Sequence, residues 1–460
     1  LYMNAIILSA LLGIVMMYSG VALKNKVAIR NLAITGLILL LVANWLEFIG
    51  MPFFLLDTKG MLVFSTFGML FNTIAFGSTL IYFLLSASAM EKIGKTNADY
   101  FALIFFILCG VSIVSAFENL LMLFIGIEII SIPLYILAGS DKLNLKSNEA
   151  ALKYFLMGSF STGLMLMGIA LLYGSTGTFY TEGLNVGGMA ITPLMGMGIV
   201  LMMVSMAFKV SAAPFHFWTP DVYDGSPTVF TSFMATVVKA AVFMAFLRLF
   251  ENAFGKMHAS WQLLVAVVTA LTLIIGNVTA VFQQSVKRML AYSSIAQAGF
   301  MMLAIFAINN TAKQGLLLYA AAYSVATIGL FAILMKLKDY TFDGFNGLAK
   351  HEPLLAITGG IFLLSLAGIP LTAGFFSKYY MLVAALRAGQ MFWLVIVGIV
   401  CAAISVYYYF RVIQAMFFKS ADENPTMEIN GRFKTMLVIT ATIVILLGVK
   451  PGLILNWLVG

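Results

Sequence analysis

Apolar runs of about twenty residues recur along the entire chain, and they constrain its fold more than any other feature. A helix needs about 20 mainly apolar residues to cross the hydrocarbon core of a bilayer. Of the 460 residues, 62% are hydrophobic and only 10% are charged. A soluble domain carries about 25% charged residues. The sequence therefore predicts an all-α polytopic membrane protein.

Fourteen apolar segments are long enough to be transmembrane spans. They lie near residues 4–22, 31–50, 67–89, 100–117, 119–139, 152–173, 193–220, 227–250, 260–282, 289–308, 314–336, 353–388, 391–418 and 435–457. Spans seven and twelve are longer than one crossing requires, and each has a proline and small residues near its middle.

Each loop is numbered here by the span that it follows. Basic residues are divided unevenly between odd-numbered and even-numbered loops. Sixteen lie in odd-numbered loops or at the adjoining span ends, and six lie in even-numbered loops or at the C-terminus. Loops rich in lysine and arginine stay in the cytoplasm, so both termini are expected on the outer side. These loops also account for the formal charge of +8, and the sequence has no basic stripe with interleaved aromatic residues that would indicate nucleic-acid binding.

Once charges in loops and at span ends are set aside, five charged residues remain inside predicted spans: Glu128, Lys209, Lys239, Lys378 and Arg411. A charge at the bilayer centre costs about 3 kcal/mol on insertion scales, and such residues usually mark a proton or ion path. A Glu–Lys pair whose separation changes can switch the lysine between its charged and neutral forms. Sodium would require several oxygen ligands, so the lysines favour protons as the transported ion.

Structural alternatives exist for several of these residues. Arg411 lies near the end of span thirteen and could extend its guanidinium to the membrane surface. Glu128 could belong to a purely structural ion pair. His216 could join a proton path or be an interfacial histidine with satisfied hydrogen bonds. Lys153, at the start of span six, is a further auxiliary candidate.

Prolines predict an interruption in each overlong span. Pro214 in "MAFKVSAAPFHFW" and Pro370 in "LAGIPLTAGFFSKYY" each remove a backbone donor and clash with the preceding turn. Lys209 precedes the first proline by five residues, and Lys378 follows the second by eight. Spans seven and twelve are five crossings apart, so a repeat that relates them must be inverted in the membrane. Paired broken helices of this kind occur in inverted-repeat transporters.

Three motifs resemble the antiporter-like proton-pumping subunits of respiratory complex I. They are "FKVSAAPFHFWTPDVYDGSPT" (208–228), "VKRMLAYSSIAQAGF" (286–300) and "GIPLTAGFFSK" (368–378). The resemblance covers essentially the whole chain. Within that group "PDVYDGSPT" is most similar to the N-type family, and Lys378 stands where M-type subunits carry a glutamate.

The resemblance implies a fold of two inverted five-helix repeats with flanking helices and broken helices 7 and 12. The implied regions are three flanking helices in 1–99, the first repeat in 100–250, the second repeat in 251–418, and a C-terminal loop with the last span in 419–460. It also implies that Glu128 is the acid partner of Lys209, that Lys239 is the central relay, and that Lys378 is the terminal proton-exchange residue.

The implied activity is proton translocation coupled to electron transfer from NADH to quinone, in the cytoplasmic (inner) membrane of a bacterium. The implied partners are the lipid bilayer and the other membrane-arm subunits. NAD, FMN, iron–sulfur clusters and quinone would bind to partner subunits and no cofactor to this chain, in which Cys109 and Cys401 lack metal-site spacing.

Two other functions remain open on the sequence alone. One is a subunit of a multi-subunit Na⁺/H⁺ antiporter, and the other is an inert scaffold between neighbouring subunits. Co-purifying flavin and iron–sulfur subunits would indicate complex I, whereas small membrane subunits alone would indicate an antiporter. A scaffold predicts that substitutions at Lys209, Lys239 and Lys378 affect assembly only.

Overall fold

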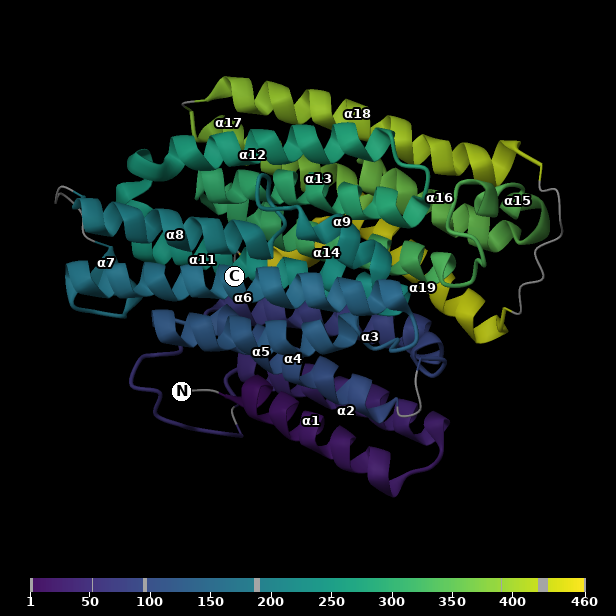
Figure 1. Cartoon of the computed structure of the whole chain (residues 1–460), viewed down its shortest axis with the longest axis horizontal. Coiled ribbons are helices and arrows are strands. Elements are labelled where there is room, and N and C mark those ends of the chain that lie inside the picture. Colours follow the sequence, from purple (N-terminus) through teal and green to yellow (C-terminus); the bar gives the residue numbers. More distant parts are fainter. Residues whose placement is uncertain are drawn as a thin grey trace. The chain divides into compact units, whose positions relative to one another are not determined.

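All regular elements in the described part of the chain are helices (Figure 1). The computed structural model describes residues 3–51, 53–93, 97–185, 191–389, 391–420 and 429–458. The first eight helices are α1 (Asn4–Ala22), α2 (Lys26–Phe48), α3 (Thr66–Met90), α4 (Ala98–Ala116), α5 (Leu120–Ala138), α6 (Leu145–Thr176), α7 (Thr181–Leu184) and α8 (Pro193–Lys209). The next six are α9 (Trp218–Gly225), α10 (Thr228–Phe233), α11 (Lys239–Phe254), α12 (His258–Val281), α13 (Val286–Ala307) and α14 (Asn310–Leu334). The last six are α15 (Leu348–His351), α16 (Pro353–Ala367), α17 (Ala373–Arg387), α18 (Phe392–Phe418), α19 (Gly431–Val449) and α20 (Gly452–Leu455).

Polar residues at the ends of the apolar runs define where helices begin. Asn119 caps α5 by accepting the Leu121 N–H, and Asn144 caps α6 by accepting the Lys146 N–H. These side chains satisfy backbone donors that a helix leaves unpaired at its first turn. The apolar sequence between such caps continues as helix because its backbone groups must bond to each other inside a membrane.

Eleven helical stretches in the described ranges are long and apolar enough to cross a membrane. One of them, Thr228–Val281, is 54 residues long and contains two of the predicted spans. The helices α8 and α16 are shorter, with 17 and 15 residues. The prediction of an all-helical, multi-pass membrane protein is confirmed.

Two interruptions lie where the prolines predict them. Residues 210–217 separate α8 from α9 and contain Pro214, and residues 368–372 separate α16 from α17 and contain Pro370. Each interruption has a non-glycine residue in the left-handed region, Ser211 at φ 65° and Leu371 at φ 72°. Such a conformation is uncommon for L-residues and prevents the helix from continuing.

The chain forms two compact units. Unit 1 comprises Leu1–Leu80, Met90–Ser211 and Val238–Leu264, and unit 2 comprises Ile81–Ala89, Ala212–Val237 and Val265–Gly460. In unit 1, α4 packs against α1, α5 and α11, and α6 packs against α8. In unit 2, α14 packs against α13, α16, α17 and α19. The most apolar 18 consecutive residues of α14 are all buried, so this helix forms the core of unit 2.

Candidate functional site

The carboxylate of Glu128 and the amine of Lys209 lie in one polar cluster of unit 1. Glu128 comes from α5, and Lys209 is the last residue of α8, directly before the first interruption. Their atoms Oε1 and Nζ are 3.9 Å apart, and the side chains are 22% and 6% exposed. A lysine at a helix C-terminus also faces the negative end of the helix dipole. The two side chains thus lie within ion-pair distance of each other.

Two hydroxyl groups complete this cluster, and sequence reasoning did not identify either of them. Lys209 Nζ donates to Ser131 Oγ at 2.9 Å and to Thr162 Oγ1 at 3.5 Å. Thr162 Oγ1 in turn donates to Glu128 Oε1 at 2.7 Å. Thr162 therefore bridges the amine and the carboxylate. Opposite unit charges about 4 Å apart attract by about 4 kcal/mol at an effective dielectric constant of about 20, so small movements here change the electrostatic energy substantially.

Lys239 follows an irregular helical turn. Residues Met234–Val238 form a π-helical turn, and Lys239 begins α11 directly after it. Such turns are rare and often occur at functional sites. Lys239 is 1% exposed, and α11 packs against α8, the helix that ends in Lys209.

Lys378 lies beside the second interruption, inside unit 2. Its amine donates to the carbonyl of Ala367 at 2.9 Å and to Ser405 Oγ at 3.2 Å. Ala367 is the last residue of α16, so the interruption leaves its carbonyl without the usual helical partner. Lys378 is 5% exposed, and Nζ lies 4.8 Å from the ring centroid of Phe300. The broken helix thus supplies an acceptor for the buried lysine.

The three auxiliary candidates have different surroundings. His216 lies in the first interruption, 6% exposed, and its ring stacks on Phe217. Lys153 lies on the surface of α6 and pairs with Glu149 at 2.8 Å, with 41% of its side chain exposed. Arg411 donates to the carbonyl of Val281 at 2.7 Å, at the C-terminal end of α12. The Arg411 contact is that of a residue that caps a neighbouring helix.

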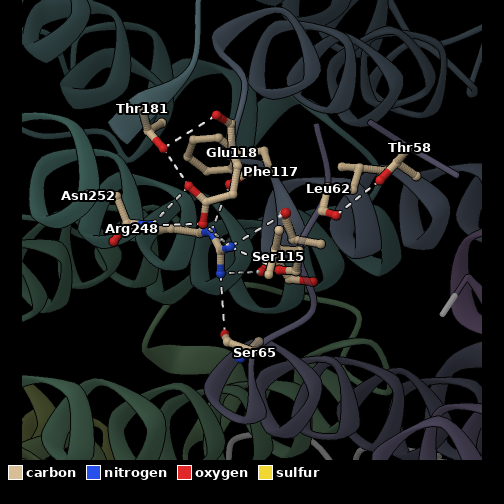
Figure 2. A network of polar contacts seen from close by, with 12 residues as sticks. Thr58, Leu62, Ser65, Ser115, Phe117, Glu118, Thr181, Arg248 and Asn252 are labelled. Carbon is tan, nitrogen blue, oxygen red and sulfur yellow. Dashed lines mark hydrogen bonds and ion pairs between the residues drawn. The ribbon is translucent and has the colours of Figure 1, made fainter. Parts of the chain in front are cut away.

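Arg248 corrects the sequence-based assignment of basic residues. It is one of the six basic residues assigned from the sequence to even-numbered loops or the C-terminus, but it lies inside α11 and is 7% exposed. Its Nη2 donates to Glu118 Oε1 at 2.6 Å and to the Val63 carbonyl at 2.9 Å. Its Nε donates to the Phe117 carbonyl at 2.9 Å, and Nη1 donates to the Ser115 carbonyl at 3.1 Å. Figure 2 shows this network.

Glu118 holds further partners from other segments. Asn252 Nδ2 donates to its carboxylate at 3.1 Å, and the Thr181 hydroxyl also donates to it. The network thus joins α11, the α4–α5 hairpin, the segment before α3 and the start of α7 (Figure 2). The short sequence "FENL" (117–120), where α4 ends and α5 begins, gives no signal of this role, because the partners of Glu118 come from distant parts of the sequence.

Metal ligands are not grouped in the described residue ranges. No cluster of three or more His, Cys, Asp or Glu side chains that could hold a metal ion occurs there. The two cysteines, Cys109 and Cys401, are both buried and unpaired by disulfide.

Known proteins share both the sequence and the fold of this chain. Residues 117–405 match the family described as NADH:quinone oxidoreductase/Mrp antiporter, TM. NADH-quinone oxidoreductase subunit N of Cytophaga hutchinsonii is 40% identical over 459 residues, 99% of each chain. The subunit of the same name from Flavobacterium psychrophilum is 36% identical and covers 99% of this chain and 100% of its own.

Solved structures agree with these relatives. A chain of respiratory complex I from Thermus thermophilus with bound aureothin superimposes with a TM-score of 0.85 at 32% identity, over 98% of both chains. A chain of the Mrp complex from Dietzia sp. has a TM-score of 0.86 at 18% identity, over 99% of this chain and 95% of its own. At that identity the Mrp likeness shows a common fold alone. The chain belongs to the family of NADH-quinone oxidoreductase subunit N, the proton-translocating membrane-arm subunit of complex I.

Proposed function

We propose that protons move through this subunit along Glu128, Lys209, Lys239 and Lys378, and that Lys209 is the switching group. The contacts of Lys209 carry the proposal: its amine bonds to Ser131 and Thr162, and Thr162 bonds to Glu128. The Lys209 amine is hydrogen-bonded to two neutral hydroxyls, and one of these hydroxyls also bonds to the Glu128 carboxylate. The amine can therefore exchange a close ion pair with the carboxylate for hydrogen bonds to neutral partners. That exchange is what a change of protonation state requires.

Thr162 provides a structural means for this exchange. Its hydroxyl lies 2.7 Å from Glu128 Oε1 and 3.1 Å from the carbonyl of Gly158, one turn earlier on α6. One hydroxyl hydrogen can serve only one of these acceptors well. In our mechanism Thr162 donates to Glu128 while Lys209 bonds to the neutral hydroxyls, and to Gly158 when the carboxylate pairs closely with Lys209.

Thr162→Val tests this bridge, because valine keeps the branched shape but removes the hydroxyl. We expect complex I that contains Thr162→Val to assemble normally and to pump protons more slowly during NADH oxidation. Pumping is not abolished, since Glu128 and Lys209 still lie 3.9 Å apart. Proton uptake by proteoliposomes, normalised to NADH oxidised, measures the effect. Thr176→Val is the matched control, because that α6 hydroxyl bonds to the Leu172 carbonyl and to no charged group. Equal pumping by the two variants would contradict the bridge.

The same family assignment supports the finer architecture. We propose fourteen spans, with α8–α9 and α16–α17 as broken spans seven and twelve, and Thr228–Val281 as two spans joined near His258. We further propose two inverted repeats, 100–250 and 251–418, flanked by 1–99 and 419–460. The two interruptions support the inversion because each combines a proline, a left-handed residue and a nearby lysine. Quinone, NAD, FMN and iron–sulfur clusters are assigned to partner subunits.

Both termini are proposed to face outward, and cysteine labelling tests this orientation. Leu143, which is 97% exposed, lies beside Lys142 in the loop between α5 and α6, and Lys146 follows in the first turn of α6. A Leu143→Cys variant should react with a membrane-impermeant maleimide in inside-out vesicles and not in right-side-out vesicles. A Lys256→Cys variant, at an exposed position of an even-numbered loop, should show the opposite pattern. The native cysteines give little background because both are buried. The reverse labelling pattern would overturn the orientation.

A further inference from the structure

A small cavity adjoins Lys378 inside unit 2. Its water-accessible volume is about 10 Å³, and about that much is needed to hold one water molecule. The polar residues that line it come from α13, α14 and the two halves of broken span twelve: Gln297, Tyr319, Tyr323, Ser365, Ser377 and Lys378. A site for a water molecule also needs two to four polar partners. Whether the cavity can bind a water molecule therefore depends on which of these side chains still have a hydrogen-bond donor or acceptor to offer.

One side of the cavity is held by a fixed hydrogen-bond network. The Tyr319 hydroxyl donates to Gln297 Oε1, and Gln297 Nε2 donates to the Leu366 carbonyl at 2.9 Å and to Tyr409 Oη at 3.0 Å. These bonds set the orientation of the amide. An amide bound on both sides does not pass protons by rotating, so Gln297 and Tyr319 are structural parts of the cavity.

Tyr323 differs from Tyr319, which lies one turn earlier on α14. Tyr323 is 4% exposed, and its hydroxyl has no hydrogen-bond partner among the described residues. Leaving a buried hydroxyl unpaired costs about 1–3 kcal/mol. The hydroxyl of Thr327, one turn later on α14 and 3% exposed, is in the same situation. The buried core helix thus carries two uncommitted hydroxyls on one face, beginning at the cavity.

Lys378 and Ser365 can supply the other partners of a water molecule. Lys378 Nζ donates to the Ala367 carbonyl and to Ser405 Oγ, which leaves one of its three hydrogens. Ser365 Oγ accepts the Gly374 N–H at 3.1 Å and can still donate its own hydrogen. Together with Tyr323, these groups provide three partners around a volume that fits one water.

We propose that the cavity binds a water molecule between Lys378 and Tyr323, and that this water and the Tyr323 hydroxyl form a proton relay to Lys378. The relay rests on the proposed role of Lys378 in proton exchange. A proton leaves Lys378 Nζ for the water oxygen while the water gives a proton to Tyr323 Oη. Tyr323 gives its own proton to Thr327 Oγ1, and Thr327 gives its hydroxyl proton to a second water molecule, which carries it away. Each N–H or O–H bond that breaks is matched by an O–H bond formed at the next oxygen, and the reverse sequence returns a proton to the lysine.

Tyr323→Phe tests the relay in the complete complex reconstituted into proteoliposomes. The ring remains and the lost hydroxyl has no protein partner in the described ranges, so assembly and thermal stability should be unchanged. Positioned proton-transfer groups contribute about 100-fold or more to a rate, and residual water at the site would recover part of that. We expect NADH-driven proton pumping to fall about tenfold. Pumping at the wild-type rate would overturn the relay.

Two further variants separate a relay from a packing role. Tyr323→Ser removes the ring, keeps a hydroxyl and makes room for water, so a relay predicts faster pumping per assembled complex than Tyr323→Phe. Packing predicts the reverse order, because serine leaves a larger cavity, and that order would contradict the proposal. Tyr319→Phe is the matched control: it leaves Gln297 Oε1 without its donor, so it should lower thermal stability more than pumping per assembled complex.

Lys378→Ala, measured in parallel, distinguishes failure of the relay from failure of the proposed function. Loss of pumping in Lys378→Ala together with normal pumping in Tyr323→Phe would reject the relay and retain Lys378 as a proton-exchange residue. Normal pumping in assembled Lys378→Ala would reject both. Loss of pumping in both variants, with the serine variant above the phenylalanine variant, supports the relay.

Discussion

Replacement of Lys209 by arginine is expected to abolish proton pumping while the complex still assembles. Arginine keeps a positive charge near Glu128 and can still donate to Ser131 and Thr162, so the ion pair and the fold are retained. The guanidinium remains protonated in proteins, however, so it cannot release a proton as the lysine must. Lys209→Met should also stop pumping, but it leaves the Glu128 carboxylate without its cation, and some loss of assembly is expected with it.

The comparison between these two variants isolates protonation from packing. Assembly is measured by native gel electrophoresis of solubilised membranes, and pumping by acidification of proteoliposomes during NADH oxidation. Lys256→Met serves as the control, because it removes a positive charge from an exposed position of the same unit. It should pump like the wild type. If the arginine variant pumps normally, Lys209 does not need to change its protonation state, and the proposed switch is wrong.

Helix positions were largely predictable because a membrane span is a local property of the sequence. The predicted spans at 100–117 and 289–308 differ by only a few residues from α4 and α13. The interruptions at Pro214 and Pro370 were predictable for the same reason, since proline acts on its own helix. The number and position of the apolar runs and prolines therefore determine most of the fold.

The partners of the buried charges were not predictable in the same way. Ser131 and Thr162 are two of many small polar residues in apolar helices, and only the packing of α5, α6 and α8 selects them. The π-helical turn before Lys239 has no glycine or proline to mark it. Tyr323 resembles Tyr319 in sequence context, and only the hydrogen bonds distinguish them. The sequence identified the titratable groups, and the tertiary structure identifies the hydrogen-bond partners and backbone features that surround them.

Arg248 shows why a hydropathy reading misplaces some charges. It lies three residues before Glu251 and four before Asn252, so the sequence there resembles the polar end of a span. Its burial depends on segments far away in the sequence, including the residues around Val63 and the α4–α5 hairpin. A reading that places each charge by its neighbours in the sequence cannot detect such long-range partners.

Arg248→Met is expected to destabilise unit 1 more than any other single substitution considered above. It leaves the Glu118 carboxylate, 24% exposed, without its cation and removes donors from several backbone carbonyls. Breaking a buried ion pair by removing one partner costs about 3–5 kcal/mol. The measurement is the temperature at which purified complex I loses this subunit, followed by native gel electrophoresis after heating.

A pair whose arginine is more exposed provides the control for Arg248→Met. Arg30 and Glu91 are 3.1 Å apart with side chains 24% and 19% exposed, and Arg30 has far fewer acceptors around it. Ion pairs with solvent access contribute about 1 kcal/mol or less, so Arg30→Met should lower the temperature only slightly. Equal losses in the two variants would mean that the burial of Arg248 adds no stability.

A double substitution then tests whether the unpaired carboxylate causes the loss. The double variant Arg248→Met/Glu118→Gln removes both charges of the ion pair. Asn252 and Thr181 can still bond to the amide oxygen of the new glutamine side chain. The double variant should therefore be more stable than Arg248→Met alone, because an uncompensated charge costs more than a neutral amide in the same place. It should remain less stable than the wild type, since the carbonyls of Val63, Ser115 and Phe117 lose their donors in both variants. If the double variant is no more stable than the single one, the backbone contacts and not the ion pair connect these segments.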